Sequence, residues 1–301
     1  MTLRAGSGLE RVLHEDGFAV TAEVVPPRSA DPALVRAQAR ALVGYADAAN
    51  VTDSPAASAH MSPVAGSALV AAEGVEPTLQ LACRDRNRLA ITGDLLGAWA
   101  LGARNVLCLT GDRITGGEAV EVHDLSVIDL VRFAVRLREE RTSPVEETLD
   151  PAPGYFVGVA DLPLARPYDV GRLEEKADAG ADFVQTQIVY DVDALGEWTE
   201  RLRPLGLFER MFVLVGVAPP RSAASARFMR SHLSGVIVPD AVIARLEGSD
   251  DPAEEGVALT VEVVKRLREI DGVAGVHVMG LGREEAVRRV IDRSGLLPRP
   301  G

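Results

Sequence analysis

LGARNVLCLTGDR, residues 101–113, contains the unit from which the chain is built. Gly102 and Ala103 suit a helix end, because a glycine in the left-handed conformation turns the chain back after the last helical turn. Residues 105–110 form a short, almost wholly apolar run, which is typical of a parallel strand buried on both faces. A polar turn with Gly111 and Asp112 follows. The stretch predicts a helix end, a buried strand and a polar loop, in that order.

The same unit recurs along the chain. Short apolar runs alternate with longer segments in which apolar residues recur at three- and four-residue spacing, as in 124–140 and 253–270. The expected strands are 18–25, 48–51, 78–83, 105–110, 155–160, 182–187, 211–218 and 275–280. Eight strand–helix units in 301 residues favour an α/β fold closed into a (βα)8 TIM barrel. An open, doubly wound parallel sheet is the alternative.

No shift in composition divides the chain, so we expect residues 1–301 to form a single (βα)8-barrel domain. The proline-containing stretch 141–154 predicts a long loop between the fourth helix and the fifth strand. A second glycine–alanine pair, Gly180 and Ala181, predicts another helix end that turns into a strand.

Composition excludes several classes of function. A net charge of −12 argues against binding to nucleic acid, which relies on concentrated Lys and Arg. Cys83 and Cys108 lie in apolar runs without metal-site spacing, and the five histidines are scattered, so we expect reduced core thiols and no metal. No apolar run approaches the ~18 residues of a membrane span, and the first 17 residues lack a signal peptide's apolar core. We expect a cytoplasmic protein that acts on a small molecule, as a monomer or a homo-oligomer.

The turn LTGDRITGG, residues 109–117, has the glycine spacing that begins a phosphate-binding P-loop. A P-loop continues with Lys and then Ser or Thr, whereas this chain continues with Gly117 and Glu118 and carries Asp112 inside the turn. The dinucleotide-binding pattern GxGxxG and the nucleophile pattern GxSxG are also absent. Asp112 is therefore either an ordinary turn residue or a functional carboxylate at a strand end.

Three more polar residues lie in apolar surroundings. Glu23 is flanked by Ala and Val, and it either lies on the surface of an edge strand or points into the barrel mouth, where desolvation would raise its pKa. Gln185 and Gln187 alternate with apolar residues on one strand. They either belong to a satisfied internal hydrogen-bond network or present amide groups to a heterocycle.

Two sets of cations remain. Arg84, Arg86 and Arg88 follow the third expected strand, where they either bind an anionic group or are solvated charges at a helix start. Lys176 lies on an expected helix, and its spacing alone predicts a solvated side chain. A separate functional hypothesis is that Lys176 forms a Schiff base with substrate, as in an unrelated barrel lyase or aldolase.

Five blocks resemble the methylenetetrahydrofolate reductase family in its short bacterial catalytic form. They are AEVVPPR, NVTDSPAA, LQLACRDRNR, NVLCLTGDR and EKADAGADFVQTQIVYD, and they occur in the family's order. The resemblance runs from about residue 8 to the end, and GVHVMGLG fits the family's last strand. It implies a TIM-barrel catalytic domain with noncovalent FAD, reduced by NADH or NADPH. It also implies reduction of 5,10-methylenetetrahydrofolate to 5-methyltetrahydrofolate in one-carbon metabolism and methionine biosynthesis.

The resemblance also implies roles for single residues. Glu23 matches the family's general acid, which assists opening of the folate's five-membered ring to an iminium. Asp112 matches an Asp between flavin and pterin, and Gln187 matches an amide that hydrogen-bonds the pterin. The positions implied to contact the cofactor are Thr52, Gln80, Asp112, Asp169 and Lys176.

Three positions depart from the family's pattern. Gln80 stands where studied relatives have a flavin-contacting His, Leu162 where they have Tyr or Asn, and Ala223 near a Phe that packs on substrate or nicotinamide. These departures bear on the flavin more than on the folate chemistry. The alternatives are a flavin-free reductase with direct hydride transfer from NAD(P)H, and a noncatalytic or partner-dependent pterin-binding subunit.

Overall fold

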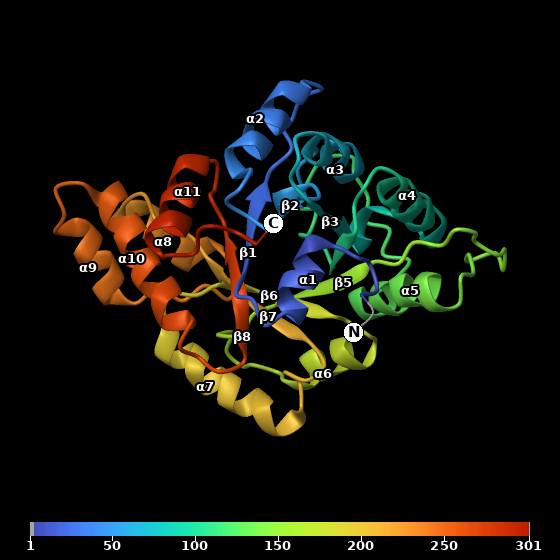
Figure 1. Ribbon diagram of the computed structural model, residues 1–301. Coiled ribbons are helices and arrows are strands. Elements are labelled where there is room, and N and C mark those ends of the chain that lie inside the picture. Colours follow the sequence, from blue (N-terminus) through green and yellow to red (C-terminus); the bar gives the residue numbers. More distant parts are fainter. Residues whose placement is uncertain (1–2, 301) are drawn as a thin grey trace.

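A computed structural model describes residues 3–300. Eight parallel strands pair in chain order and close on themselves, with β1 beside β8 (Figure 1). This closure confirms the predicted (βα)8 TIM barrel and excludes the open sheet. The strands are β1 (Ala19–Val24), β2 (Ala48–Val51), β3 (Pro77–Ala82), β4 (Asn105–Leu109), β5 (Phe156–Asp161), β6 (Phe183–Ile188), β7 (Phe212–Val217) and β8 (Val273–Val278).

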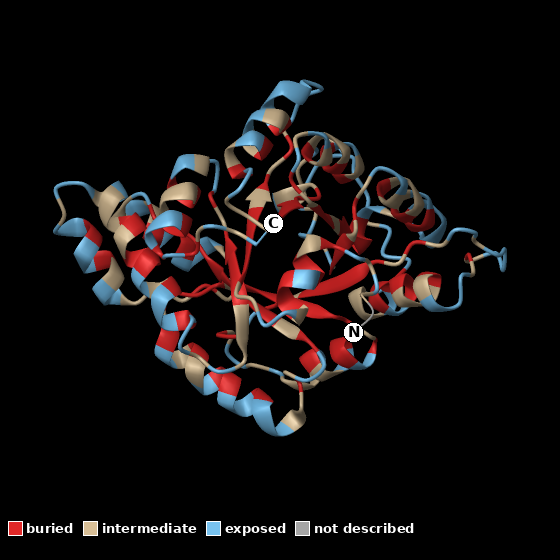
Figure 2. Cartoon of the chain, in the orientation of Figure 1, coloured by how far each residue is buried: buried red, intermediate tan, exposed pale blue. Residues whose placement is uncertain are grey.

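The helices surround the ring of strands, and their outer faces carry the exposed residues (Figure 2). They are α1 (Gly8–His14), α2 (Pro32–Leu42), α3 (Pro63–Ala72), α4 (Arg88–Ala100), α5 (Val127–Glu139), α6 (Gly171–Asp178), α7 (Val192–Leu202), α8 (Ala223–His232), α9 (Asp240–Glu247), α10 (Pro252–Leu267) and α11 (Glu284–Arg293). Three short 3₁₀ turns are η1 (Pro55–Ala57), η2 (Cys83–Asp85) and η3 (Arg203–Leu205). Within residues 3–300, no helix is long and apolar enough to cross a membrane.

Local sequence explains where the helices begin and end. Ser126 caps α5 by accepting a hydrogen bond from the N–H of Asp129, and Asn87 caps α4 in the same way through Ala90. Gly102 and Gly180, in the predicted helix-to-strand turns, have φ of 101° and 96°. Only glycine adopts such angles without strain, which accounts for the two glycine–alanine pairs.

The barrel interior is layered. Its amino end is apolar and is closed by α1, which lies over the middle of the ring in Figure 1. The side chains of this layer are Leu9, Val12, Leu13, Ala19, Ala48, Leu107, Phe156, Phe183 and Leu214. Polar residues begin in the next layer, toward the carboxyl ends of the strands, where TIM barrels carry their active sites. The catalytic groups of this barrel are therefore expected at that end.

The connection from β7 to β8 is longer than one strand–helix unit requires. It contains α8 and α9 before α10, which packs against β7 and α11. The additional helices form a small core of their own with Ile188 and Tyr190, from the end of β6 and just beyond it. The sequence pattern predicts only the third helix of this connection, because α8 and α9 are short and their apolar faces are narrow. The 141–154 loop is present as expected, with one bridge between Thr142 and Thr148.

Candidate functional site at the carboxyl end of the barrel

Glu23 lies at the mouth of the barrel. The closed barrel has no edge strand, which removes the edge position as an alternative. Thr21, two residues earlier, points inward because its hydroxyl accepts a hydrogen bond from Gln185 across the interior and contacts His277 on the neighbouring strand β8. Side chains alternate along a strand, so Glu23 faces the same space one layer higher. Glu23 is partly buried, and desolvation raises its pKa to about 7. It can therefore hold a proton near neutrality.

A buried polar network forms the layer beneath Glu23. The amides of Asn50 and Gln185 exchange hydrogen bonds of 2.6 and 3.3 Å, and Gln185 also donates to Thr21 at 3.2 Å. Thr21 Oγ1 lies 2.9 Å from Nδ1 of His277, whose burial lowers its pKa to about 4. The internal-network interpretation is thus correct for Gln185. The site above stands on a neutral, hydrogen-bonded floor.

Asp112 is exposed on the turn after β4 and is held against the loop after β2. Its Oδ2 accepts a hydrogen bond of 2.6 Å from the N–H of Ala56. Gly111, just before it, has a φ of 89°, and a Cβ there would lie 2.9 Å from the Cβ of Arg84. Glycine is therefore needed for both the angle and the close approach. The turn presents a carboxylate at the barrel mouth.

Gln187 lies at an irregularity in the pairing of β6 with β7, where the register shifts between Gln185 and Ile188. Bulges of this kind re-aim side chains and are common beside active sites. The Oε1 of Gln187 accepts from the N–H of Ile188 at 2.9 Å, and its Nε2 donates to the carbonyl of Ser234 at 3.3 Å. Glu23, Asp112 and Gln187 thus occupy the same end of the barrel. No hydrogen bond joins any two of them within residues 3–300.

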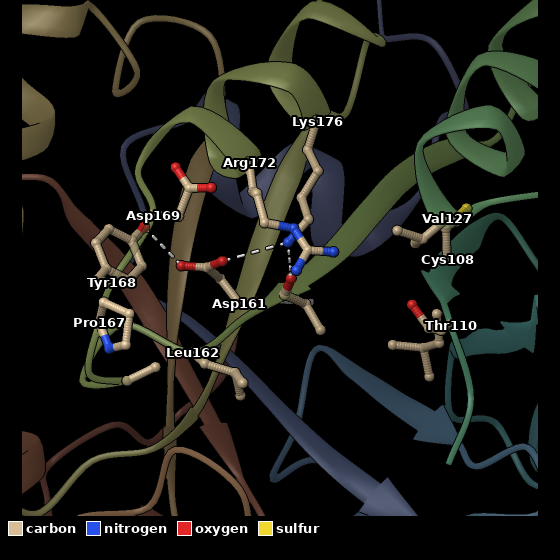
Figure 3. A pocket seen from close by; sticks show the side chains of 13 residues that line it. Cys108, Thr110, Val127, Asp161, Leu162, Pro167, Tyr168, Asp169, Arg172 and Lys176 are labelled. Atoms are coloured by element: carbon tan, nitrogen blue, oxygen red, sulfur yellow. Dashed lines mark hydrogen bonds and ion pairs between the residues drawn. The ribbon is translucent and has the colours of Figure 1, made fainter. Parts of the chain in front are cut away.

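A cavity of about 330 Å³ opens beside the mouth, between the ends of β4 and β5 and helix α6 (Figure 3). Asp169 and Lys176 line it, together with Thr110, Leu162 and Tyr168. Thr52 and Gln80 do not. Thr52 lies two residues after Asn50 and Gln80 two residues after Thr78, so both face the barrel interior, as those two residues do.

Lys176 is buried, which corrects the prediction of a solvated side chain. Its Nζ donates to the carbonyl of Ala160 at 2.6 Å and lies 3.3 Å from Oδ1 of Asp161. Tyr168 donates its hydroxyl to the other oxygen of Asp161 at 2.9 Å, as Figure 3 shows. Burial and the Asp161 charge raise the pKa of Tyr168, so it remains a neutral donor. Because Asp161 and a carbonyl hold the ammonium, a Schiff-base role for Lys176 finds no support.

Two cavity residues were missed by the sequence reasoning. Arg172 is exposed on α6, one helical turn before Lys176, and Figure 3 shows both side chains extending from that helix. Tyr168 adds an aromatic ring. The signal that could have found Arg172 is its i, i+4 spacing from Lys176, which places the two on one helix face.

The arginine cluster is tied to carboxylates, which corrects the solvated-charge interpretation for Arg84 and Arg86, whereas Arg88 is an exposed charge at the start of α4 as that interpretation expects. Arg84 is only 2% exposed and pairs with Asp85. The largely buried Arg86 pairs with Asp53 and Asp94, and the exposed Arg88 pairs with Asp124.

Cys83 and Cys108 are buried and free, as expected. Within residues 3–300, no three His, Cys, Asp or Glu side chains gather where they could hold a metal ion.

Fold and site together define a (βα)8 barrel with its polar groups and cavity at the carboxyl ends of the strands, the place where such barrels carry out chemistry. The chain belongs to the methylenetetrahydrofolate reductase family, whose sequence model matches residues 8–295. This confirms the resemblance found in the sequence.

Individual relatives agree with the family. The chain is 26% identical over 254 residues to a "Probable methylenetetrahydrofolate reductase (NADPH)" of Caenorhabditis elegans, covering 79% of this chain and 36% of that protein. It is 29% identical to "Methylenetetrahydrofolate reductase 1" of Schizosaccharomyces pombe, covering 74% and 36%. The "5,10-methylenetetrahydrofolate reductase" of Salmonella typhimurium is 24% identical, covering 75% and 72%. The match therefore spans little more than a third of the two eukaryotic relatives.

Solved structures support the fold. An uncharacterized protein from Clostridium thermocellum, described as binding two copies of 5-methyl-5,6,7,8-tetrahydrofolic acid, has a TM-score of 0.66 at 13% identity, covering 96% of this chain and 100% of that one. A 2,3-dimethylmalate lyase has a TM-score of 0.53 at 15% identity, covering 100% and 91%. The two differ in their described ligand or chemistry, so at this identity they support the barrel alone.

Proposed function

We propose that this chain reduces 5,10-methylenetetrahydrofolate to 5-methyltetrahydrofolate, with reducing equivalents from NADH or NADPH. The observation that carries the proposal is Glu23, a carboxyl at the barrel mouth whose pKa of about 7 suits proton donation at neutral pH. Membership of the reductase family and the folate ligand described for the Clostridium protein support the substrate.

The reaction needs one proton and one hydride. The product keeps its methyl group on N5, so the bond from the methylene carbon to N10 must break. N10 takes the proton, the remaining N5 iminium is a cation, and the hydride adds to its carbon. Glu23 would supply the proton to N10 and would then be left as a carboxylate. The neutral floor of Asn50, Gln185 and Thr21 places no cation beneath it that would lower its pKa.

The other two residues would act on charge and orientation. Asp112 would stabilise the cationic iminium, since a carboxylate at the mouth favours positive charge. Its Oδ1 has no protein donor among residues 3–300, so it can accept from a pterin N–H. Gln187 offers an amide, which supplies both a donor and an acceptor to a heterocycle edge. Its present bonds to Ile188 and Ser234 would have to be exchanged for bonds to the ligand.

FAD is the cofactor that the family resemblance implies. Two observations fit it: the buried Thr52 hydroxyl has no partner within residues 3–300, and Arg172 brings an exposed guanidinium to the cavity. The residues that would hold it are Thr52, Gln80, Asp112, Asp169 and Arg172, and Lys176 would join them by exchanging its bonds to Ala160 and Asp161 for bonds to the cofactor. When bound, it would relay reducing equivalents from NAD(P)H to the folate.

A flavin-free reductase, with hydride passing directly from NAD(P)H, is the second candidate. Two observations favour it. The Lys176 ammonium is already taken by Ala160 and Asp161 and is not free for a phosphate. Leu162 supplies hydrocarbon where the resemblance implies a polar ring contact, and it packs against the segment 233–239 that joins α8 and α9. A Cβ on Gly235 of that segment would lie 3.1 Å from the Cβ of Leu162. The roles of Glu23, Asp112 and Gln187 are the same in both versions.

The experiment is oxidation of NADH and NADPH by the purified chain with methylenetetrahydrofolate, with and without added FAD. The proposed function predicts folate-dependent oxidation that Glu23→Gln reduces at least about 100-fold, the scale of general acid catalysis. Glu269→Gln, at an exposed carboxylate just after α10, is the matched control and should keep full activity.

The absorption spectrum separates the versions. Flavin absorbance that copurifies with the chain and is needed for turnover supports FAD, and turnover by colourless protein without FAD supports direct transfer. Binding of 5-methyltetrahydrofolate without any NAD(P)H oxidation would overturn the reductase proposal and leave a noncatalytic or partner-dependent pterin-binding subunit.

A further inference from the structure

We propose that Arg84 is a positioning residue that sets the place of the Asp112 carboxylate, an inference that rests on the proposed function of Asp112. The structure joins the two through the main chain: Nη1 of Arg84 donates to the carbonyl of Asp112 at 3.0 Å. Arg84 lies in η2, directly after β3, and Asp112 lies on the turn after β4. One buried guanidinium therefore holds the main chain of the neighbouring turn.

The guanidinium is oriented by a second interaction. Its Nε and Nη2 donate to the two oxygens of Asp85, each at 2.7 Å, which is the planar, two-point pairing that only arginine makes. This pairing lowers the pKa of Asp85 and keeps its charge. With one edge held in this way, Nη1 is directed at Asp112.

Arg84 also reaches the loop after β2. Its Nη2 lies 3.4 Å from the carbonyl of Ser54. In the same loop, the N–H of Ala56 donates to Oδ2 of Asp112 at 2.6 Å. Asp112 is thus held at both ends, by Arg84 at its carbonyl and by Ala56 at its carboxylate. The contacts close a ring of three partners around the proposed catalytic carboxylate.

The β2 loop needs such support because of its backbone. Ser54, Ala56 and Ala57 have φ of 47°, 54° and 53°, the left-handed region that non-glycine residues rarely occupy. Conformations of this kind persist only where the surrounding structure holds them, and they gather at functional sites. Within 54–57 the contacts to other elements are Ser54 to Arg84 and Ala56 to Asp112, and both belong to the same ring. Asp53, just before this stretch, is held separately by Arg86 and by the N–H of Ala82.

The test is a double-mutant cycle on folate reduction with the full chain. Arg84→Lys keeps the charge but cannot reach Asp85, Asp112 and Ser54 together. We expect it to lower kcat about tenfold, the scale of a small misplacement of a reacting group, with little change in KM. In an Asp112→Asn background the same change should cost less than about twofold, because the charge it positions is gone.

Asp85→Asn is a second variant for the same double-mutant cycle, because it weakens the pairing that orients Arg84. Asp85 is partly exposed, so this variant should fold. It should lower kcat in the wild-type background and not in Asp112→Asn. Arg88→Met is the matched control, because it removes an exposed arginine of the same motif that pairs with Asp124. Equal losses from Arg84→Lys in both backgrounds, or full kcat in Arg84→Lys, would overturn the proposal.

Hydrogen exchange tests the same ring without any turnover. Arg84→Lys should speed amide exchange in peptides that cover 54–57 and 111–113, and Arg88→Met should not. Unchanged exchange in Arg84→Lys refutes the positioning role. A wild-type chain with no reductase activity refutes the proposed function instead, so the two failures can be told apart.

Discussion

Asn50 on β2 and Gln185 on β6, 135 positions apart, exchange hydrogen bonds across the inside of the barrel at 2.6 and 3.3 Å. Asn50 is also the register neighbour of Glu23 on β1. The amide pair therefore ties the floor of the site to the strand that carries the proposed acid. Both amides are buried and need partners; Asn50 finds them in Gln185, whereas Gln185 also donates to Thr21.

Replacing Gln185 by Leu should destabilise the protein by about 2 kcal/mol, since it leaves the buried Asn50 amide without its partner. The double variant Asn50→Leu/Gln185→Leu should recover part of this loss, because no unpaired amide remains. Urea unfolding at equilibrium measures both. A Gln185→Leu protein as stable as wild type would show that the amide pair contributes nothing to stability.

Patterning along the chain predicts the barrel but not the partners inside it. Runs such as 48–51 and 105–110 could be located because a strand buried on both faces must be apolar, and β2 occupies the first without a change of boundary. The ion pairs of Lys176 and Arg84 could not be located, because a single sequence does not show which carboxylate will meet a cation. Asp161 lies 15 residues from Lys176 and approaches it only when β5 and α6 pack.

For the site too, the sequence predicts where residues lie along the strands but not which partners they contact. The positions of Glu23 and Asp112 at strand ends could be inferred from their flanking residues, because parallel strands bring their carboxyl ends together. The strained β2 loop and its contact with Asp112 could not, since left-handed Ser54 and Ala56 carry no glycine signal. The amide of Gln187 is re-aimed by a bulge that alternation along β6 does not predict.

The rate of folate reduction should depend on pH through Glu23. Burial raises its pKa to about 7, so the carboxyl is protonated below that pH and ionised above it. A general acid acts only when protonated. The single-turnover rate should therefore be level below about pH 7 and fall about tenfold per unit above it. Rapid-mixing measurements of folate reduction at a series of pH values would follow this limb.

Asp112→Asn serves as the control for this prediction. It should lower the rate at every pH and leave the fall near pH 7 in place, because it does not remove the acid. A rate that stays level well above neutral pH would contradict proton donation by Glu23.

Acid stability should depend on His277. Burial lowers its pKa to about 4, whereas an unfolded histidine titrates near 6.5. The unfolded chain therefore binds this proton first as the pH falls. The stabilising contribution is complete above about pH 6.5 and is lost down to pH 4, at a cost of about 3 kcal/mol.

Unfolding free energies of wild type and His277→Gln, compared from neutral pH down to about pH 4, should show a flatter acid limb in the variant. His232→Gln, at an exposed histidine in α8, should keep the wild-type limb. Parallel acid limbs for wild type and His277→Gln would refute the prediction.

Gly158 on β5 makes room for the ring of Phe183 on β6. A Cβ at Gly158 would lie 2.2 Å from Cζ of Phe183, and that ring cannot retreat because it stacks on Phe156 with centroids 5.1 Å apart. Gly158→Ala should therefore destabilise the protein by about 3 kcal/mol through overpacking. Adding Phe183→Leu should restore part of that stability, since the smaller side chain leaves space for the methyl group.

Gly196 in α7 provides the matched control for Gly158, because a Cβ at this position would meet open space. Gly196→Ala should be neutral or stabilise the protein by about 1 kcal/mol, since alanine has the higher helix propensity. Thermal and urea unfolding of wild type and the three variants decide the matter. A Gly158→Ala chain as stable as Gly196→Ala would mean that the contact between β5 and β6 is looser than the structure requires.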